Sequence, residues 1–189
     1  MDMWNEYDQL IKEHNELIKK FDNSSLKPVG EITYTEIPGI YNGKFTNGTL
    51  GWIKHGSYRS KGNVGTLLQT PARVSSLSQL VSLNSTDVGI VFWVKANPIG
   101  GEVILEVVIN EIKVFSKKFA GSEMDFDWEN IVIPIEPIFK VKEYYGFETE
   151  GLYLIEFMVP TGAFPDAQIS LDNVTLARIE YQPYEPKIG

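Results

Sequence analysis

The segment QISLDNVTLARI, from Gln168 to Ile179, decides the fold. If this segment is a β-strand, its side chains alternate between two faces, so Asp172 shares a face with the apolar residues Val174 and Leu176. A carboxylate that faces a core must be hydrogen-bonded, paired with a cation or bound to a metal. We therefore expect Asp172 to be a structural clamp or a metal ligand. We also expect it to meet the glycine- and asparagine-rich segment NGKFTNGTLGW of residues 42–52.

Apolar and polar residues alternate with a period of two through most of the chain after Gly30, with Gly, Pro and Asn between the segments. Val88–Ala96 is almost continuously apolar, which is typical of a central strand covered on both sides, so we expect Trp93 to lie in the core. This spacing predicts a mainly β protein, a two-sheet antiparallel β-sandwich of the jelly-roll type. The expected strands are Glu31–Ile37, Tyr58–Ser60, Thr66–Gln69, Ser76–Leu83, Val88–Ala96, Glu102–Ile109, Ile112–Phe119, Trp128–Ile135, Leu152–Val159 and Gln168–Tyr181.

The first 21 residues have a helical period instead. Apolar and aromatic residues recur at alternating spacings of three and four, which predicts one N-terminal amphipathic α-helix from about Met3 to Phe21. A single short helix needs a partner surface. Either it forms a coiled-coil seam that makes a homo-oligomer or docks another protein, or it packs on the sandwich of its own chain. The predicted seam residues are Trp4, Tyr7, Ile11, His14, Ile18 and Phe21.

The chain is expected to divide into a helix and linker (1–29), a β-sandwich (30–181) and a proline-rich tail (182–189). Its 17 basic and 25 acidic residues give a net charge of -8, which opposes binding to a nucleic-acid backbone. The absence of cysteine excludes disulfides and Cys-ligated zinc. No apolar run is long enough to insert in a membrane, and MDMWNEYDQL lacks the apolar stretch of a signal peptide. We therefore expect that the protein is located on a virion or at the cell exterior and that it arrives there without a signal peptide.

Several short motifs occur in a characteristic order between Tyr34 and Ile179. They are Asn42-Gly43-Lys44-Phe45-Thr46, Gly51-Trp52, Leu77-Ser78-Gln79, Phe92–Ala96, Trp128–Pro134, Gly151–Phe157 and Asp172–Leu176. This order resembles that of the jelly-roll carbohydrate-binding modules with the galactose-binding-like fold, and the N-terminal helix lies outside the resemblance.

The resemblance implies a structural calcium site between the opening motif and the closing aspartate. Calcium takes six to eight oxygen ligands. Asp172 would supply a carboxylate, and backbone carbonyls near Asn42 and Lys44 would supply further oxygens. However, Lys44 and Thr46 stand where the family usually has acidic residues. The alternative is that backbone amides or Lys44 satisfy Asp172, with no metal.

Glycan binding is also implied, and it requires exposed aromatic rings beside polar groups, because sugar C–H faces stack on rings while hydroxyls form hydrogen bonds. The candidate contacts on loops and strand ends are Trp52, Tyr58, Arg59, Trp128, Tyr144 and Tyr145.

Acidic residues alternate with apolar ones at Glu123, Asp125, Asp127 and Glu129. A glycosidase uses a pair of carboxylates, so this run could be an active site. The alternative is a solvated sheet edge whose charges discourage association between sheets.

Three functions follow from these features. The first is a non-catalytic structural or attachment protein of a phage or archaeal virion, as a decoration, fibre or tail component, and it rests on fold analogy and context. The second is a carbohydrate-binding module of a secreted or cell-surface protein. The third is a glycoside-active enzyme. The expected partners are further copies of the chain, other virion or surface proteins, and glycans.

Overall fold

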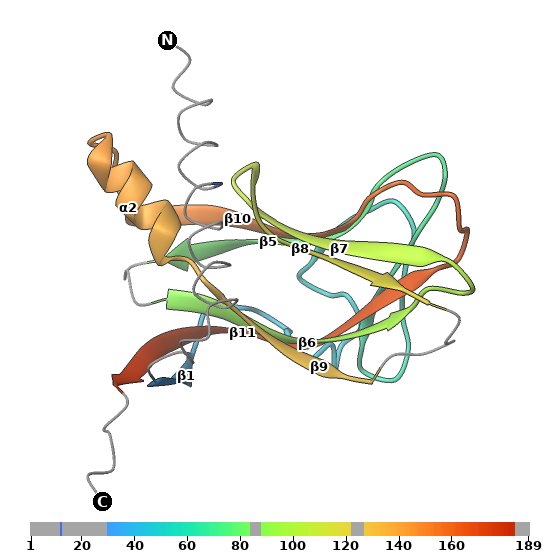
Figure 1. Cartoon of the computed structure of the whole chain (residues 1–189), viewed down its shortest axis with the longest axis horizontal. Coiled ribbons are helices and arrows are strands. Elements are labelled where there is room, and N and C mark those ends of the chain that lie inside the picture. The colour runs from blue at the N-terminus through green and yellow to red at the C-terminus, as the bar shows by residue number, and fades with distance from the viewer. Residues whose placement is uncertain (1–11, 13–29, 84–87, 122–126, 184–189) are drawn as a thin grey trace, which may run out of the picture.

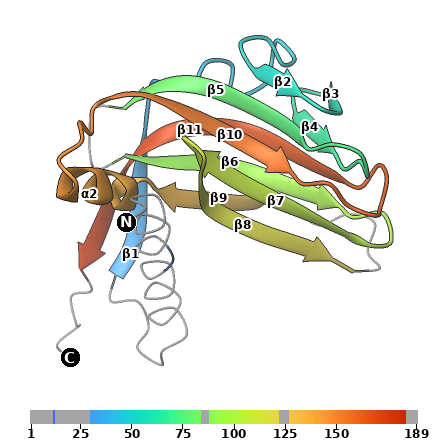
Figure 2. The ribbon, with the colours of Figure 1, turned by 90° about the horizontal axis from the view of Figure 1, so that it is seen from above.

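The computed structural model describes residues 12, 30–83, 88–121 and 127–183. Two antiparallel sheets face each other across one apolar core, as Figures 1 and 2 show. The predicted β-sandwich is therefore confirmed. The predicted N-terminal helix, with all six seam residues, lies outside the described residues.

The six-stranded sheet has a long central strand, β11 (Gln168–Pro183), and the five-stranded sheet is built around β10 (Gly151–Val159). The order in the first sheet is β3 (Tyr58–Ser60), β4 (Gly65–Leu68), β11, β6 (Val88–Asn97) and β9 (Glu129–Pro134), with β1 (Gly30–Ile37) pairing the C-terminal half of β11. The order in the second is β2 (Ile53–His55), β5 (Ser75–Leu83), β10, β7 (Glu102–Ile109) and β8 (Ile112–Ala120).

The core follows from the alternation in the sequence. On β10, Tyr153, Ile155, Phe157 and Val159 all point inward and are 1% exposed or less. The Phe157 ring lies edge-on to Phe92 of β6, with 5.0 Å between the ring centroids, so the two sheets meet through aromatic contacts. Burying such apolar surface is the main stabilising contribution to a fold of this kind.

The alternation is broken once in β11, and this overturns the prediction for Asp172. Asp172 pairs with Trp93 and Thr175 pairs with Val91, so two residues of β11 lie opposite one residue of β6. This β-bulge reverses the faces. Residues 169 and 171 are buried before it, and 174 and 176 are buried after it. Asp172 therefore lies on the outer face of the sheet, and the prediction that it faces the core is wrong.

One helix, α2 (Glu136–Tyr144), was not predicted from the sequence. It follows β9 directly and lies at the end of the sandwich where β10 begins, as Figure 1 shows. Ile138 and Phe139 are 2% and 1% exposed, and the Phe139 ring lies edge-on to Tyr153 at 5.6 Å. The helix therefore closes this end of the core. Among the described residues, no helix is long and apolar enough to cross a membrane.

An ion pair joins the two sheets along one side. Lys117 on β8 donates to both carboxylate oxygens of Glu129 on β9, at 2.7 and 2.6 Å. Each of these strands is the last strand of its sheet. The contact therefore connects the margins of the two layers.

Candidate functional site

Trp93 lies on the outer face of the six-stranded sheet, not in the core. Its chain neighbours Phe92 and Val94 are buried at 0% and 1%, whereas Trp93 is 39% exposed. Asn130 on β9 and Asp172 on β11 pair with it from either side, and cross-strand partners project to the same face. The indole is therefore flanked by an amide and a carboxylate. The expectation of a core position is wrong, because β6 has a solvent-accessible outer face at this point.

Asn130 carries an amide without a partner. Its Nδ2 is shielded from solvent, and it is the one buried side-chain nitrogen or oxygen in the described part of the chain that has no hydrogen bond. Leaving such a donor unpaired costs about 1–3 kcal/mol, so unpaired groups of this kind in native proteins require an explanation. Because this nitrogen is closed to solvent, a ligand on the surface can reach it only after the Asn130 side chain moves.

A second tryptophan extends the exposed aromatic surface. Trp128 is 40% exposed, directly precedes β9 and lies two residues before Asn130. If the alternation of β9 continues by one residue, Trp128 lies on the same face as Asn130. The expectation that Trp128 is an accessible aromatic residue agrees with this position, and its contact with a glycan stays a prediction.

Polar side chains continue this face across the neighbouring strands. Lys95 pairs with Ser170, Ser170 with Thr66, and Thr66 with Arg59. Thr66 is only 5% exposed, and its hydroxyl lies 3.0 Å from that of Ser170, while Arg59 Nη2 donates to Gln168 Oε1 at 3.0 Å. We call the whole set the tryptophan face, and its members are Arg59, Thr66, Trp93, Lys95, Trp128, Asn130, Gln168, Ser170 and Asp172.

Trp52 is a core residue and is not available as a platform for a sugar. It is 3% exposed, and its ring stacks on Phe45 at 5.4 Å and meets the edge of Phe157 at 6.1 Å. Its Nε1 donates to the carbonyl oxygen of Asn42 at 3.1 Å. The prediction that Trp52 contacts a glycan is wrong, because a glycine-rich segment that resembles a surface loop folds over the core here.

The other predicted aromatic contacts lie apart from the tryptophan face. Tyr58 is 42% exposed on β3, and alternation directs it away from the face that holds Arg59. Tyr144 and Tyr145 end and follow α2, with their rings edge-to-face at 5.1 Å. Trp128 precedes the first residue of β9, whereas α2 follows the last one. The two tyrosines therefore lie at the other end of β9, away from the tryptophan face.

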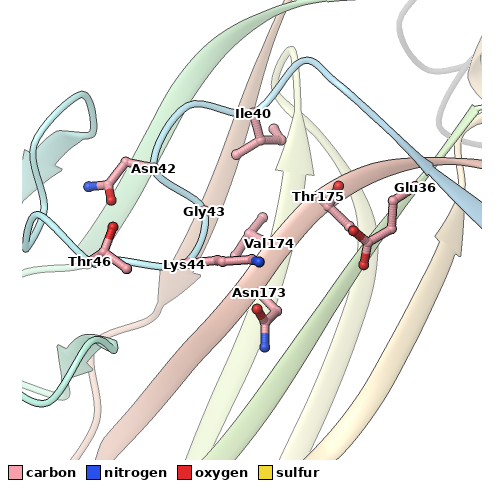
Figure 3. Close-up of a pocket in the computed structure, with 9 residues that line it drawn as sticks. All are labelled: Glu36, Ile40, Asn42, Gly43, Lys44, Thr46, Asn173, Val174 and Thr175. Atoms are coloured by element: carbon pink, nitrogen blue, oxygen red, sulfur yellow. The ribbon is translucent and has the colours of Figure 1, made fainter.

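A pocket of about 300 Å³ lies where the Asn-Gly segment meets β11, as Figure 3 shows. The backbone N–H of Val174 donates to the carbonyl oxygen of Gly43 at 3.0 Å. The predicted contact between this segment and the closing strand therefore exists, but it is made through the bulge and not through Asp172. The lining residues are Glu36, Ile40, Asn42, Gly43, Lys44, Thr46, Asn173, Val174 and Thr175.

The residues at this pocket do not fit a calcium ion. The side-chain oxygen of Asn42 accepts from the backbone N–H of Asn47, and its carbonyl oxygen accepts from Trp52. Asp172 does not line the pocket, and its Oδ1 accepts from the N–H of Asn173 at 2.7 Å. Lys44 adds a positive charge to the lining, and no group of three or more His, Cys, Asp or Glu among the described residues could hold a metal. Calcium stays a prediction for which these donors offer no support.

The acidic run does not place all its carboxylates on one free surface. Asp127 is exposed, whereas Glu129 is held by the ion pair with Lys117. Glu123 and Asp125 lie outside the described residues. The structure therefore provides no pair of facing carboxylates in the described part of this run.

No protein-family model matches the sequence, and no curated protein matches it. Solved structures with a similar fold include a family 61 carbohydrate-binding module in complex with β-1,4-galactotriose, at 17% identity and a TM-score of 0.47, over 74% of this chain and 97% of that chain. Another is a family 27 module described for mannan recognition, at 12% sequence identity and a TM-score of 0.45, over 77% of this chain and 98% of that chain. A Stig cyclase from Fischerella sp. TAU matches at 15% sequence identity and a TM-score of 0.43, over 81% of this chain and 100% of that chain. The likeness is one of fold, shared by binding modules and by a cyclase.

Proposed function

We propose that this protein binds a glycan on its tryptophan face without catalysing a reaction. The observation that carries the proposal is the partly exposed indole of Trp93 on β6, beside hydrogen-bonding side chains, with a second partly exposed indole, Trp128, directly before the neighbouring strand β9. A tryptophan on a sheet face normally buries its ring. Two such rings offer accessible apolar surface in a polar setting.

The chemistry of this surface matches that of a sugar ring. Indole faces pack against the C–H surface of a sugar, and amides and carboxylates exchange hydrogen bonds with its hydroxyls. The unpaired amide of Asn130 and the carboxylate of Asp172 lie on either side of Trp93. A hydroxylated ligand stacked on Trp93 would lie between these two partly exposed side chains.

The extent of the face favours an oligosaccharide over a single sugar. The face crosses five neighbouring strands from Asn130 on β9 to Arg59 on β3. Four strand spacings of about 4.8 Å give a length of about 19 Å, which exceeds one sugar ring. We infer that the ligand chain lies across the strands.

Binding without catalysis is supported by the carboxylates of the face. Asp172 is the one acidic side chain among the residues of the tryptophan face. Glycoside hydrolysis uses two carboxyl groups on either side of the bond that is cleaved. A virion role and oligomerisation stay predictions from the sequence, because the segments that motivate them lie outside the described residues.

The test is a glycan array, followed by titration of the selected glycan into wild-type protein and into Trp93→Ala. We expect Trp93→Ala to weaken binding by about 30-fold, the effect of losing a central aromatic contact worth about 2 kcal/mol. Trp93→Phe should recover part of the loss, because it retains an aromatic face.

The matched control is Tyr144→Ala, which removes a more exposed ring, 79% accessible, outside the face. It should leave the affinity unchanged. A flat array, or a loss of binding in Tyr144→Ala with none in Trp93→Ala, would refute the proposal. Far-UV circular dichroism of each variant shows whether the fold is retained.

A further inference from the structure

The tryptophan face carries two positive side chains that have no carboxylate partner within the described part of the chain. Lys95 of β6 and Arg59 of β3 both project from the outer side of the sheet, in register with Ser170 and Thr66. The hydrogen bond of Arg59 goes to the neutral amide of Gln168. By contrast, Lys113, Lys117 and Lys118 of β8 each form an ion pair with a glutamate.

This arrangement contrasts with the acidic character of the whole chain. The net charge is -8, yet the tryptophan face holds two cations and one carboxylate. That carboxylate, Asp172, accepts from a backbone N–H and forms no ion pair with Lys95 or Arg59. Unpaired charges of one sign on a single face attract ligands of the opposite sign.

From these charges we propose that the tryptophan face selects acidic glycans, with uronate carboxylates or sulfate groups, over neutral ones. This inference rests on the proposed glycan binding and specifies its ligand class. Arg59 is suited to the task because its planar guanidinium can grip a carboxylate or sulfate through two parallel hydrogen bonds. Lys95 supplies a second point charge two residues along β6 from Trp93.

The separation of the two cations favours a polymer over a small anion. Lys95 and Arg59 lie three strand spacings apart in the sheet, about 14 Å, with the Thr66 and Ser170 hydroxyls between them. One phosphate or carboxylate cannot contact both side chains over this distance without drawing them together. An oligosaccharide with acidic groups on separate sugar units can contact both while it stacks on Trp93.

The experiment compares acidic polymers with their neutral counterparts by affinity gel electrophoresis of the full chain. The probes are polygalacturonate and alginate, each paired with its carboxyl-reduced form, and chondroitin sulfate, paired with a form that is both desulfated and carboxyl-reduced, at low and at physiological salt. We expect tighter binding to at least one acidic form than to its neutral counterpart. This preference should shrink as salt rises, because the contacts are solvent-accessible.

Two double variants separate a local charge effect from a general one. Arg59→Gln with Lys95→Gln should reduce binding to the acidic polymer by about three- to tenfold, as expected for two exposed ion pairs, and should lower the ratio of acidic to neutral affinity. Lys113→Gln with Lys118→Gln removes the same total charge from the five-stranded sheet. This variant should bind the acidic and the neutral polymer as the wild-type protein does.

Equal binding of acidic and neutral forms by the wild-type protein would overturn the inference. An equal loss in the Lys113/Lys118 variant, or equally tight binding of single-stranded DNA, would also overturn it by showing a non-specific charge effect. If neutral forms bind and Trp93→Ala abolishes that binding while Arg59 and Lys95 have no influence, the proposed function stands and only this inference fails. If no polymer binds in either form, both fail.

Discussion

Replacing Gly43 by alanine should release the Asn-Gly segment from β11. A Cβ atom at this position would lie 1.8 Å from the carbonyl oxygen of Val174, whereas Cβ atoms essentially never approach closer than 3.0 Å. Ile40 closes the other side, with its Cγ2 at 3.2 Å. The backbone at position 43 must therefore move away from β11 to admit a methyl group.

The cost of this movement follows from the contacts it breaks. Increasing the separation from 1.8 Å to at least 3.0 Å also stretches the 3.0 Å hydrogen bond between the Val174 N–H and the Gly43 carbonyl well past its useful range. An unpaired, mostly buried donor costs about 1–3 kcal/mol, and overpacking a tight site costs a similar amount. We expect Gly43→Ala to lower the free energy of unfolding by about 2–4 kcal/mol, which for a chain of this size corresponds to a fall in Tm of about 4–15 °C.

Urea unfolding followed by circular dichroism measures this loss, and Gly62→Ala is the control. A Cβ at Gly62 meets nothing within 4 Å, although its φ of +68° is strained for alanine, so Gly62→Ala should cost only about 1 kcal/mol. If Gly43→Ala is no less stable than Gly62→Ala, the segment is not fastened to β11 in the way described. Glycan binding by the folded fraction should survive the change, since Gly43 lies outside the tryptophan face.

Two further predictions concern the same region. Trp52→Ala should destabilise the fold by about 3–5 kcal/mol in urea unfolding, which is the usual cost of removing a buried aromatic ring, and Trp52→Phe should cost less. Unchanged stability of the Trp52→Ala protein would contradict the buried stack of Trp52 on Phe45. A chelator should leave Tm unchanged, because Asn42 already uses its oxygens for hydrogen bonds within its own turn. A fall in Tm of several degrees that added calcium reverses would restore the calcium prediction, because an ion bound only by the folded state raises stability.

Much of the sandwich can be predicted from the sequence, because strands with one buried face carry a period of two. The inward set on β10 is an example, since every second residue from Tyr153 to Val159 is apolar and buried. Helix α2 was missed because it is short and contains Pro137, which normally argues against a helix. A proline in the first turn is tolerated, because the backbone N–H there needs no helical partner.

The binding surface was harder to predict than the fold. Trp93 sits in a nearly continuous apolar run, and such a run does not show that one side of the strand is open at a single position. The sequence placed Trp128 and Arg59 among the candidates but gave no indication that they share a face, because this depends on the pairing of β9 with β6 and of β3 with β4. The register between paired strands, which decides which side chains become neighbours, could not be read from the sequence.

The β-bulge opposite Phe92 also determines which changes of length β11 can accept. Deleting Asn173, whose φ of 47° suits the bulge, would remove the extra residue and restore strict alternation, with Ile169 and Leu171 still on the same face as Val174 and Leu176. Loss of the bulge with Asn173 retained would instead put Asp172 in phase with Val174, so that either the carboxylate turns into the apolar interior or Val174 turns out of it. The bulge thus allows a strand with one additional residue to present polar groups to a ligand over its first half while both halves still contribute to the same interior.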